Sequence, residues 1–373
     1  MNNLHILEKM NIPLFRQDLI SWFEKEQRDL PWRKDKNPYK VWVSEIMLQQ
    51  TRVDTVIPFF NRFMEWFPTL EELAEADEEK VLKAWEGLGY YSRVRNLQSA
   101  VREVAAEYNG VVPDTLEAIS KLKGVGPYTA GAILSIAYGK PEPAVDGNVM
   151  RVLSRILLIE EDIAKPRTRK TFEEAVRRLI DETHTSSFNQ ALMELGAMIC
   201  TPGTPACLLC PVREHCEAFA EGVQSRLPVK NQQKKTRDVP IAAAVISNSR
   251  NEILIRKRPS KGLLANLWEF PNYEVHASVA TKRESFRQQF QEQLQVIPQL
   301  GEHLISIDHT FSHLVWKMEV FLGKAEEVSE NIMNSHQMKW VAESEVEGYA
   351  FPVSHQKIWK AYQLLKSQST NQR

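Results

Sequence analysis

All four cysteines of this 373-residue chain lie within seventeen residues of one another, in the pattern C-x6-C-x2-C-x5-C. They are Cys200, Cys207, Cys210 and Cys216. Four thiolates on one short loop can close around a metal centre, and a [4Fe–4S] cluster is held by four cysteine thiolates. An all-thiolate zinc site needs the same sulfurs but usually pairs them closely, and here the first cysteine stands apart. The spacing therefore favours an iron–sulfur cluster over zinc, and two disulfides are the weakest alternative.

Composition and charge are those of a globular protein and do not identify a partner. Hydrophobic residues make up 43% of the chain and charged residues 25%, which is ordinary for a soluble domain. No apolar run reaches the length of a membrane span, and the N-terminus lacks the pattern of an export signal. We therefore expect a cytoplasmic protein with no membrane partner. The net charge of −1 means that a nucleic acid would have to be bound by locally focused basic groups.

The periodicity of apolar residues changes along the chain and predicts two domains of different class. Residues 14–221 show the three- and four-residue spacing of helices, and residues 222–239 are polar and basic like a linker. Beyond them, strands are predicted at 240–247, 252–257, 304–307, 314–322 and 338–341, with helices at 281–295 and 353–367. The sequence thus predicts an all-α domain over 1–221 and a smaller α+β domain over 240–373.

A Gly-x-Gly turn lies between two predicted helices, at 114–121 and 127–138. Gly124 and Gly126 let the backbone approach a ligand closely, and Pro127 suits the first turn of the second helix. Free N–H groups at that helix start could face a DNA phosphate, although a plain helix–helix turn explains the residues equally well. A similar turn upstream carries Leu88 and Tyr90, which could insert into a base stack if exposed or could belong to the core.

Two carboxylates stand out by their context. Glu45 shares a face with apolar neighbours on a helix predicted over 42–51, and burial there would raise its pKa and keep it protonated as a general acid requires. Asp146 precedes an apolar helical run, where an N-cap role alone would account for it. Together, a protonated and an ionised carboxylate in one cleft form the arrangement that cleaves glycosidic bonds.

The combination of hairpin, Asp146 in V-D-G-N-V and cysteine loop closely resembles the endonuclease III superfamily of DNA base-excision glycosylases. Three segments, at 31–51, 87–96 and 188–200, are similar to those of the adenine glycosylases of the MutY type. These enzymes remove adenine mispaired with 8-oxoguanine. The resemblance spans nearly the whole chain, and it implies a [4Fe–4S] cluster on the four cysteines.

Carried over to this chain, the resemblance implies a role for each matching residue. Glu45 would protonate N7 of a flipped adenine and later deprotonate the attacking water, and Asp146 would stabilise the oxocarbenium-like sugar. The supporting catalytic residues would be Tyr128 and Asn148, and the adenine pocket would contain Trp32, Arg33 and Gln190. Contacts to the duplex near the mispair would come from Gln50, Thr51, Leu88, Tyr90, Gly124 and Gly126. The implied partner is double-stranded DNA with an 8-oxoguanine:adenine or guanine:adenine mispair, bound by a monomer.

Tyr128 decides between reaction types within the superfamily. Bifunctional glycosylase/lyases carry a lysine at this place, and tyrosine cannot form a Schiff base. The resemblance therefore implies a monofunctional hydrolase. A glycosylase/lyase for oxidised pyrimidines is disfavoured by Tyr128 and Glu45, and a non-catalytic mispair-binding protein is disfavoured by the presence of both carboxylates.

The C-terminal domain resembles the 8-oxoguanine recognition domain of the same family, which is similar in fold to Nudix hydrolases. Residues 262–271 match its usual opening, whereas residues 281–295 lack the acidic cluster that would hold Mg²⁺. We therefore expect binding without hydrolysis, with Phe311, Ser312 and His313 meeting the oxidised guanine. One departure concerns the loop TPGTPA at 201–206, which has no basic residue where relatives often have one.

Overall fold

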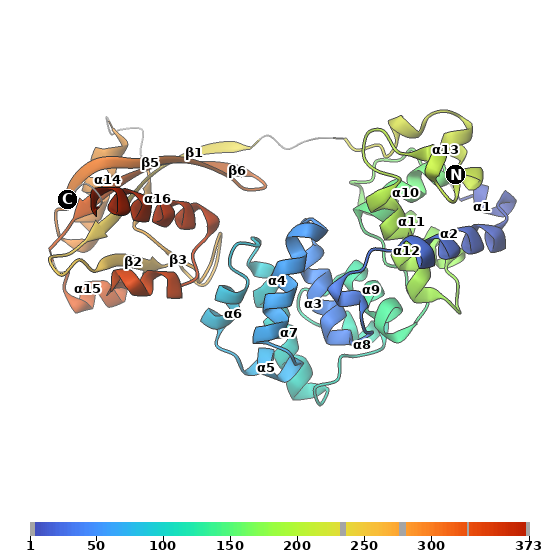
Figure 1. Cartoon of the computed structure of the whole chain (residues 1–373), viewed down its shortest axis with the longest axis horizontal. Coiled ribbons are helices and arrows are strands. Elements are labelled where there is room, and N and C mark those ends of the chain that lie inside the picture. The colour runs from blue at the N-terminus through green and yellow to red at the C-terminus, as the bar shows by residue number, and fades with distance from the viewer. Residues whose placement is uncertain (1–3, 232–235, 276–280, 327, 371–373) are drawn as a thin grey trace. The chain divides into compact units, whose positions relative to one another are not determined.

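The computed structural model describes residues 4–231, 236–275, 281–326 and 328–370. The chain forms two compact units, of which the first draws on residues 1–75 and 96–232 and the second on residues 76–95 and 233–373 (Figure 1). Among the described residues, no helix combines the length and the apolar character needed to cross a membrane.

The first unit is helical, as predicted. Its helices are α1 (Ile6–Lys9), α2 (Ile12–Glu26), α3 (Pro38–Leu48), α4 (Val53–Trp66), α5 (Leu70–Glu75), most of α7 (Ser92–Glu107), α8 (Leu116–Ile119), α9 (Pro127–Tyr138), α10 (Gly147–Ile156), α11 (Pro166–Leu179), α12 (Thr185–Met198) and α13 (Glu217–Ala220). Short 3₁₀ turns lie at Pro31–Arg33, Cys207–Leu209, Arg213–His215 and Gln224–Arg226.

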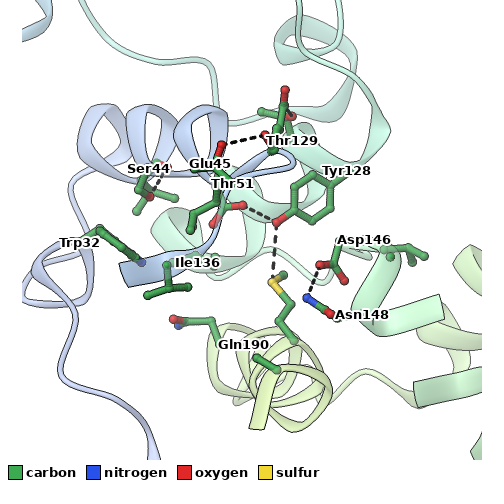
Figure 2. Close-up of a pocket in the computed structure, with 18 of the residues that line it drawn as sticks. Trp32, Ser44, Glu45, Thr51, Tyr128, Thr129, Ile136, Asp146, Asn148 and Gln190 are labelled. Carbon is green, nitrogen blue, oxygen red and sulfur yellow. Dashed lines mark hydrogen bonds between the residues drawn. The ribbon is translucent and has the colours of Figure 1, made fainter. Parts of the chain in front are cut away.

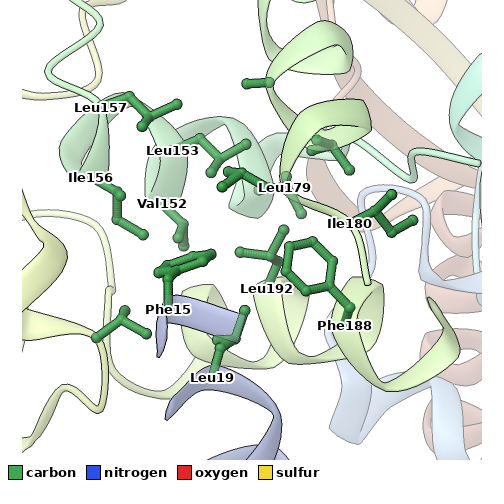
Figure 3. Packing of buried hydrophobic residues seen from close by; sticks show 14 of the residues in the cluster. Phe15, Leu19, Val152, Leu153, Ile156, Leu157, Leu179, Ile180, Phe188 and Leu192 are labelled. Carbon is green, nitrogen blue, oxygen red and sulfur yellow. The ribbon is translucent and has the colours of Figure 1, made fainter. Parts of the chain in front are cut away.

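One hydrophobic core packs α10 and α12, two of the helices that carry the candidate site. Side chains of α2, α10, α11 and α12 meet in it, with Phe15, Val152 and Phe188 fully buried (Figure 3). Burying a side chain of this size contributes about 1.5–3 kcal/mol. The helical spacing seen in the sequence is the physical reason for this packing, because it puts the apolar residues of each helix on one face.

The hairpin between α8 and α9 needs its first glycine. Gly124 has a φ of +80°, and a Cβ there would lie 2.9 Å from the Cβ of Asn96. Gly126 is the N-cap of α9, and Pro127 is its first residue. The predicted helix at 127–138 is confirmed, whereas the one at 114–121 is shorter, since α8 covers only Leu116–Ile119.

Helix α3 is also shorter than predicted at its C-terminal end. The periodicity indicated helix through 51, but α3 ends at Leu48. Gln50 has a left-handed φ of +59°, which a continuing helix does not allow. At the other end, the side chain of Asn37 caps the helix by accepting hydrogen bonds from Tyr39 N and Lys40 N.

The second unit is a mixed sheet covered by helices on both faces. Its strands are β1 (Arg237–Ser247), β2 (Ile253–Lys257), β3 (Trp268–Glu269), β4 (Asn272–Glu274), β5 (Gln299–Thr310), β6 (Leu314–Lys324) and β7 (Met338–Val341). Its helices are α6 (Glu78–Ala84), α14 (Lys282–Leu294), α15 (Glu330–Ser335) and α16 (Val353–Thr370), with a 3₁₀ turn at Glu343–Gly348. The path through the sheet is β3-β2-β1-β6-β5, with β4 paired to β1 and β7 to β2; β1 and β6 run parallel.

Side chains of β1 alternate between two cores. Ile241 and Val245 pack with Trp359 of α16 on one face, and Ala242 and Ile246 pack against the α14 side on the other. This two-residue period is the reason that the segment reads as a strand. The predicted α+β class is confirmed; β1 begins three residues earlier than expected, and β3 and β4 were not predicted.

Residues 76–95 pack with the second unit although they are distant from it in sequence. Lys257 Nζ lies 2.6 Å from Glu79 Oε1, and the Phe351 amide donates to Glu86 Oε1 at 2.7 Å. Glu79 of α6 and Glu86, which follows this helix, thus bind a lysine and a backbone amide of the second unit. The domain boundary predicted at residue 221 did not anticipate that residues 76–95 belong to the second unit.

Candidate active site and cysteine loop

A cavity of about 760 Å³ in the first unit gathers the residues predicted for catalysis and adenine binding (Figure 2). Its lining comes from α3, the start of α9, the start of α10, α12 and the Pro31–Arg33 turn. The predicted residues in the lining are Trp32, Arg33, Glu45, Gln50, Thr51, Gly124, Gly126, Tyr128, Asp146, Asn148 and Gln190. Segments more than a hundred residues apart in the sequence therefore meet at one concave site.

Glu45 is a buried acid in the lining of this cavity. Its side chain is 4% exposed, and its Oε2 accepts a hydrogen bond from the Tyr128 hydroxyl. Burial raises the pKa of Glu45 to about 7; the Tyr128 hydrogen bond lowers it, and the nearby Asp146 raises it further. A carboxylic acid with this pKa can hold a proton near neutral pH and release it again.

Asp146 has a double role in the geometry. Its Oδ1 caps α10 by accepting from Val149 N at 2.7 Å, and its Oδ2 accepts from Asn148 Nδ2 at 3.0 Å. Burial raises the pKa of Asp146, and these two donors together with the charge of Arg151 oppose that rise. The N-cap interpretation is therefore correct, and the same carboxylate also lines the cavity.

The burial of Glu45 has a consequence for stability. Because the pKa of Glu45 is raised from 4.5 to about 7 in the folded state, folding favours the protonated form, and stability is lost as the pH rises between these two values. At about 1.4 kcal/mol per pKa unit, ionisation of the buried Glu45 lowers the free energy of unfolding by about 3 kcal/mol at high pH. We expect Glu45→Gln to stabilise the fold, with a gain that is about 2 kcal/mol larger at pH 8 than at pH 5. Urea unfolding of both proteins at the two pH values measures this; an equal gain at both would contradict it.

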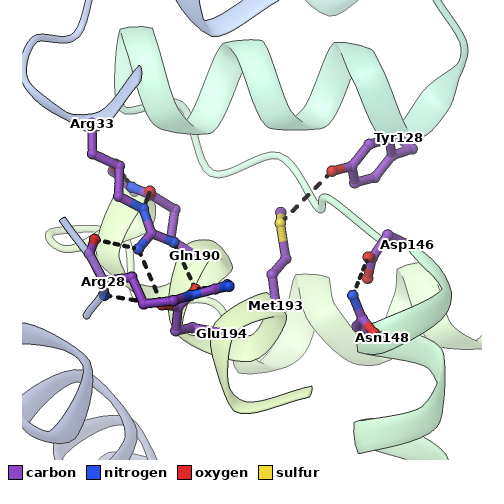
Figure 4. Close-up of polar contacts among 9 residues, drawn as sticks. Arg28, Arg33, Tyr128, Asp146, Asn148, Gln190, Met193 and Glu194 are labelled. Carbon is purple, nitrogen blue, oxygen red and sulfur yellow. Dashed lines mark hydrogen bonds and ion pairs between the residues drawn. The ribbon is translucent and has the colours of Figure 1, made fainter. Parts of the chain in front are cut away.

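An ion-pair cluster at the same wall was missed in the sequence. Glu194 is 1% exposed and lies between Arg28 and Arg33, with N–O distances of 2.8 and 2.9 Å (Figure 4). Burial would raise the pKa of Glu194, but hydrogen bonds from the two arginines outweigh it and lower the value to about 2. A glutamate on an apolar helix face was the signal that selected Glu45, and the same signal was present at Glu194.

This cluster also orients the predicted adenine-pocket residue Gln190. Arg33 Nε donates to Gln190 Oε1 at 3.0 Å, and Gln190 Nε2 donates to Ser186 Oγ at 3.1 Å. Met193, a further residue that the sequence did not single out, places its sulfur 3.8 Å from the Tyr128 hydroxyl (Figure 4).

Hydrogen bonds connect Asp146 to the first cysteine. Arg151 donates through one NH2 group to Asn148 Oδ1 at 2.8 Å and to Gly196 O at 2.7 Å, and through Nε to Cys200 O at 2.8 Å. A Cβ at Gly196 would lie 2.7 Å from the Cβ of Asn148, so the close approach of α12 to α10 requires glycine. The predicted catalytic and cysteine segments are thus parts of one hydrogen-bonded assembly.

The four cysteines surround a small apolar cavity beside α10. All four are free thiols, and their neighbours in the lining include the buried Val152, Leu195 and Val212. Within the described ranges, no three His, Cys, Asp or Glu side chains are grouped closely enough to be recognised as a site for a single metal ion. The four cysteine sulfurs nevertheless suit a centre held by thiolates. Arg155 NH1 donates a hydrogen bond to Cys200 Sγ at 3.2 Å, and such a contact stabilises a negatively charged sulfur.

A separate cavity of about 400 Å³ lies within the second unit and is lined by Tyr90, Phe311, Ser312 and His313. Tyr90 is 50% exposed, and its hydroxyl lies 3.4 Å from Ser312 Oγ. Phe311 makes edge-on contacts with His309 and Trp316 at centroid distances of 4.6 and 5.0 Å. Leu88 is only 7% exposed, so it does not have the exposed position that insertion into a base stack needs.

Comparisons with known proteins agree with this architecture. Residues 43–178 match the HhH-GPD superfamily of base excision DNA repair proteins, and residues 242–361 match the NUDIX domain. A solved thermostable thymine-DNA glycosylase is similar with a TM-score of 0.51 and 27% identity, over 56% of this chain and 97% of that one. The fold and the site therefore define a helix-hairpin-helix base-excision repair enzyme joined to a Nudix-like domain.

Relatives that align with most of the chain identify its family within this class of enzymes. Adenine DNA glycosylases of Rattus norvegicus and Schizosaccharomyces pombe are each 35% identical to the chain. The alignments cover 95% and 92% of this chain and 78% and 88% of the two relatives. The chain belongs to the adenine DNA glycosylase family, as the sequence motifs predicted.

Proposed function

We propose that this protein removes adenine from 8-oxoguanine:adenine and guanine:adenine mispairs in double-stranded DNA, as a monofunctional and monomeric hydrolase. The observation that carries the proposal is the cavity in which Glu45, with a pKa of about 7, faces Tyr128 and shares the lining with Asp146. Cleavage of an N-glycosidic bond needs a proton for the leaving base and a negative charge for the sugar.

Glu45 donates its proton to N7 of the flipped adenine, which makes the base a neutral leaving group. Asp146 stabilises the positive charge that develops on the sugar, while its hydrogen bonds to Val149 N and Asn148 hold the carboxylate in place. The ionised Glu45 then takes a proton from the attacking water and is restored. Tyr128 orients Glu45 by its hydrogen bond and offers no amine for a Schiff base.

The adenine pocket is formed by Trp32, Arg33 and Gln190. Because Arg33 occupies Gln190 Oε1 and Ser186 accepts one Nε2 hydrogen, the second Nε2 hydrogen can donate to a ring nitrogen of the base. Gln50, Thr51, Gly124 and Gly126, at the rim of the same cavity, contact the duplex. The base opposite adenine is read by Tyr90 and the Phe311–Ser312–His313 loop of the domain over 240–373.

A [4Fe–4S] cluster is held by Cys200, Cys207, Cys210 and Cys216. When bound, it supplies an anionic, rigid centre for the loop rather than a reacting group. The four free thiols around one cavity and the Arg155 hydrogen bond to Cys200 support this assignment. The apolar core around the loop would shield the centre from water.

The proposal is tested by single-turnover reactions on matched duplexes that carry adenine opposite 8-oxoguanine, guanine or thymine, and thymine opposite guanine. Adenine should be released fastest opposite 8-oxoguanine, more slowly opposite guanine and hardly at all opposite thymine. Release of thymine, or of no base, would overturn the proposed substrate.

The recognition loop gives a further expected result. Ser312 can donate or accept a hydrogen bond, and 8-oxoguanine differs from guanine by a C8 carbonyl and an N7–H. A contact of this kind discriminates by about 1–3 kcal/mol. The double substitution Ser312→Ala with Phe311→Ala should therefore reduce the preference for 8-oxoguanine over guanine about tenfold at low substrate concentration, with an unchanged rate at saturation.

Ser306→Ala is the matched control, because Ser306 lies on β5 and hydrogen-bonds His303 outside this cavity. Competition between the two duplexes measures the preference. If the double variant keeps the wild-type preference, the loop does not read the opposite base.

A further inference from the structure

Arg155 is a buried cation that joins three segments of the first unit. It lies on α10, is 2% exposed, and donates to Cys200 Sγ at 3.2 Å, to Thr201 O at 2.9 Å and to Leu227 O at 3.0 Å. One guanidinium therefore holds the first cysteine, the loop that follows it and the start of the segment that leads to the second unit.

The charge of Arg155 has no carboxylate partner among the ion pairs of the described residues. Arginine stays protonated at physiological pH, and burying a cation without a counter-charge is costly. The neighbouring charged residue on α10 is Arg151, another cation, which is 8% exposed and faces Asn148 and backbone carbonyl oxygens. Of these two arginines, Arg155 lines the cysteine cavity, whereas Arg151 lies near the carboxylate of Asp146. The group in contact with Arg155 that can become anionic is the thiol of Cys200.

We propose that Arg155 is the buried counter-ion of the iron–sulfur centre and sets its redox potential through the hydrogen bond to Cys200. This inference rests on the cluster proposed above and concerns a positioning residue outside the catalytic cavity. A cation that donates to a ligand sulfur stabilises the more negatively charged state of the centre, so removing it makes oxidation easier.

The test is a voltammetric titration of the full-length, cluster-loaded protein, with the electrode as acceptor of one electron from the cluster. Arg155→Met removes the charge and keeps an unbranched side chain. It should shift the oxidation equilibrium at least tenfold toward the oxidised cluster, which lowers the midpoint potential by at least about 59 mV for a one-electron couple. Arg155→Lys keeps the charge and should restore most of the wild-type potential.

Arg213→Gln is the matched control, because Arg213 lines the same cavity but pairs with Glu214 at 2.7 Å in a more exposed position. Its potential should stay close to that of the wild type. Trypsin cleavage after the exposed Arg226, next to the buried Leu227, measures how firmly Arg155 holds the backbone at Leu227. This readout does not depend on the redox potential of the cluster. Cleavage should become several-fold faster in both Arg155 variants.

The outcomes separate the two proposals. A wild-type protein without iron and sulfide would overturn the cluster and this inference together. A cluster-loaded Arg155→Met protein with the wild-type potential, or equal shifts in the Met and Lys variants, would overturn only the counter-ion role. If Arg155→Met folds but cannot keep a cluster, retention by Arg155→Lys supports the role, and loss from both contradicts it.

Discussion

Glu45→Gln is expected to slow adenine release under single-turnover conditions by about a thousandfold or more, while the affinity for the mispaired duplex stays within a few-fold. Glutamine fills the same volume and can still accept the Tyr128 hydrogen bond, but it cannot give a proton to the base or take one from water. General acid–base catalysis of this kind contributes about 10²–10⁴ in rate. Rapid quench of the duplex reaction and a binding titration measure the two quantities.

Glu117→Gln is the matched control, since Glu117 is an exposed glutamate of α8 that pairs with Lys121 and does not line the catalytic cavity. It should behave like the wild type. A Glu45→Gln protein that releases adenine within tenfold of the wild-type rate would remove Glu45 from the chemistry.

Asp146→Asn should lower the single-turnover rate by at least about a hundredfold, because it removes the negative charge that faces the developing positive charge on the sugar. Asparagine is as good an N-cap as aspartate, so α10 should keep its start at Gly147. Asp146→Ala removes charge and cap together and should cost about 1 kcal/mol of stability in addition.

These two variants separate the charge from the cap. Thermal unfolding should place Asp146→Asn close to the wild type and Asp146→Ala below it. If Asp146→Asn cleaves at a near wild-type rate, the aspartate is a structural cap alone.

Sequence patterns predicted the parts of the site that have a local signal. Glu45 was recognisable because a glutamate interrupts an apolar helix face, and its burial and raised pKa follow from that position. Asp146 was recognisable as a cap from the helix that it precedes. The resemblance to a known family then assigned both to one cavity, which local patterns could not do, since the two residues are a hundred positions apart.

Features that depend on long-range packing were not predictable in this way. The pairing of Glu194 with Arg28 and Arg33 joins segments more than 160 residues apart, and the charge of Glu194 alone does not name its partners. The association of residues 76–95 with the sheet domain has the same origin. The two short strands β3 and β4 were missed, and the choice between a buried and an exposed Leu88 stayed open, because a few residues carry too little periodicity to reveal their environment.

The central claim is that this chain excises adenine by hydrolysis through a buried acid and without an amine nucleophile. A single-turnover reaction on an 8-oxoguanine:adenine duplex, divided into untreated, alkali-treated and borohydride-treated portions, tests it most directly. We predict release of adenine in all three, strand breaks only after alkali, and no covalent adduct with borohydride, because Tyr128 cannot form a Schiff base. Strand breaks without alkali together with a borohydride-trapped adduct, or intact adenine in every portion, would contradict the account.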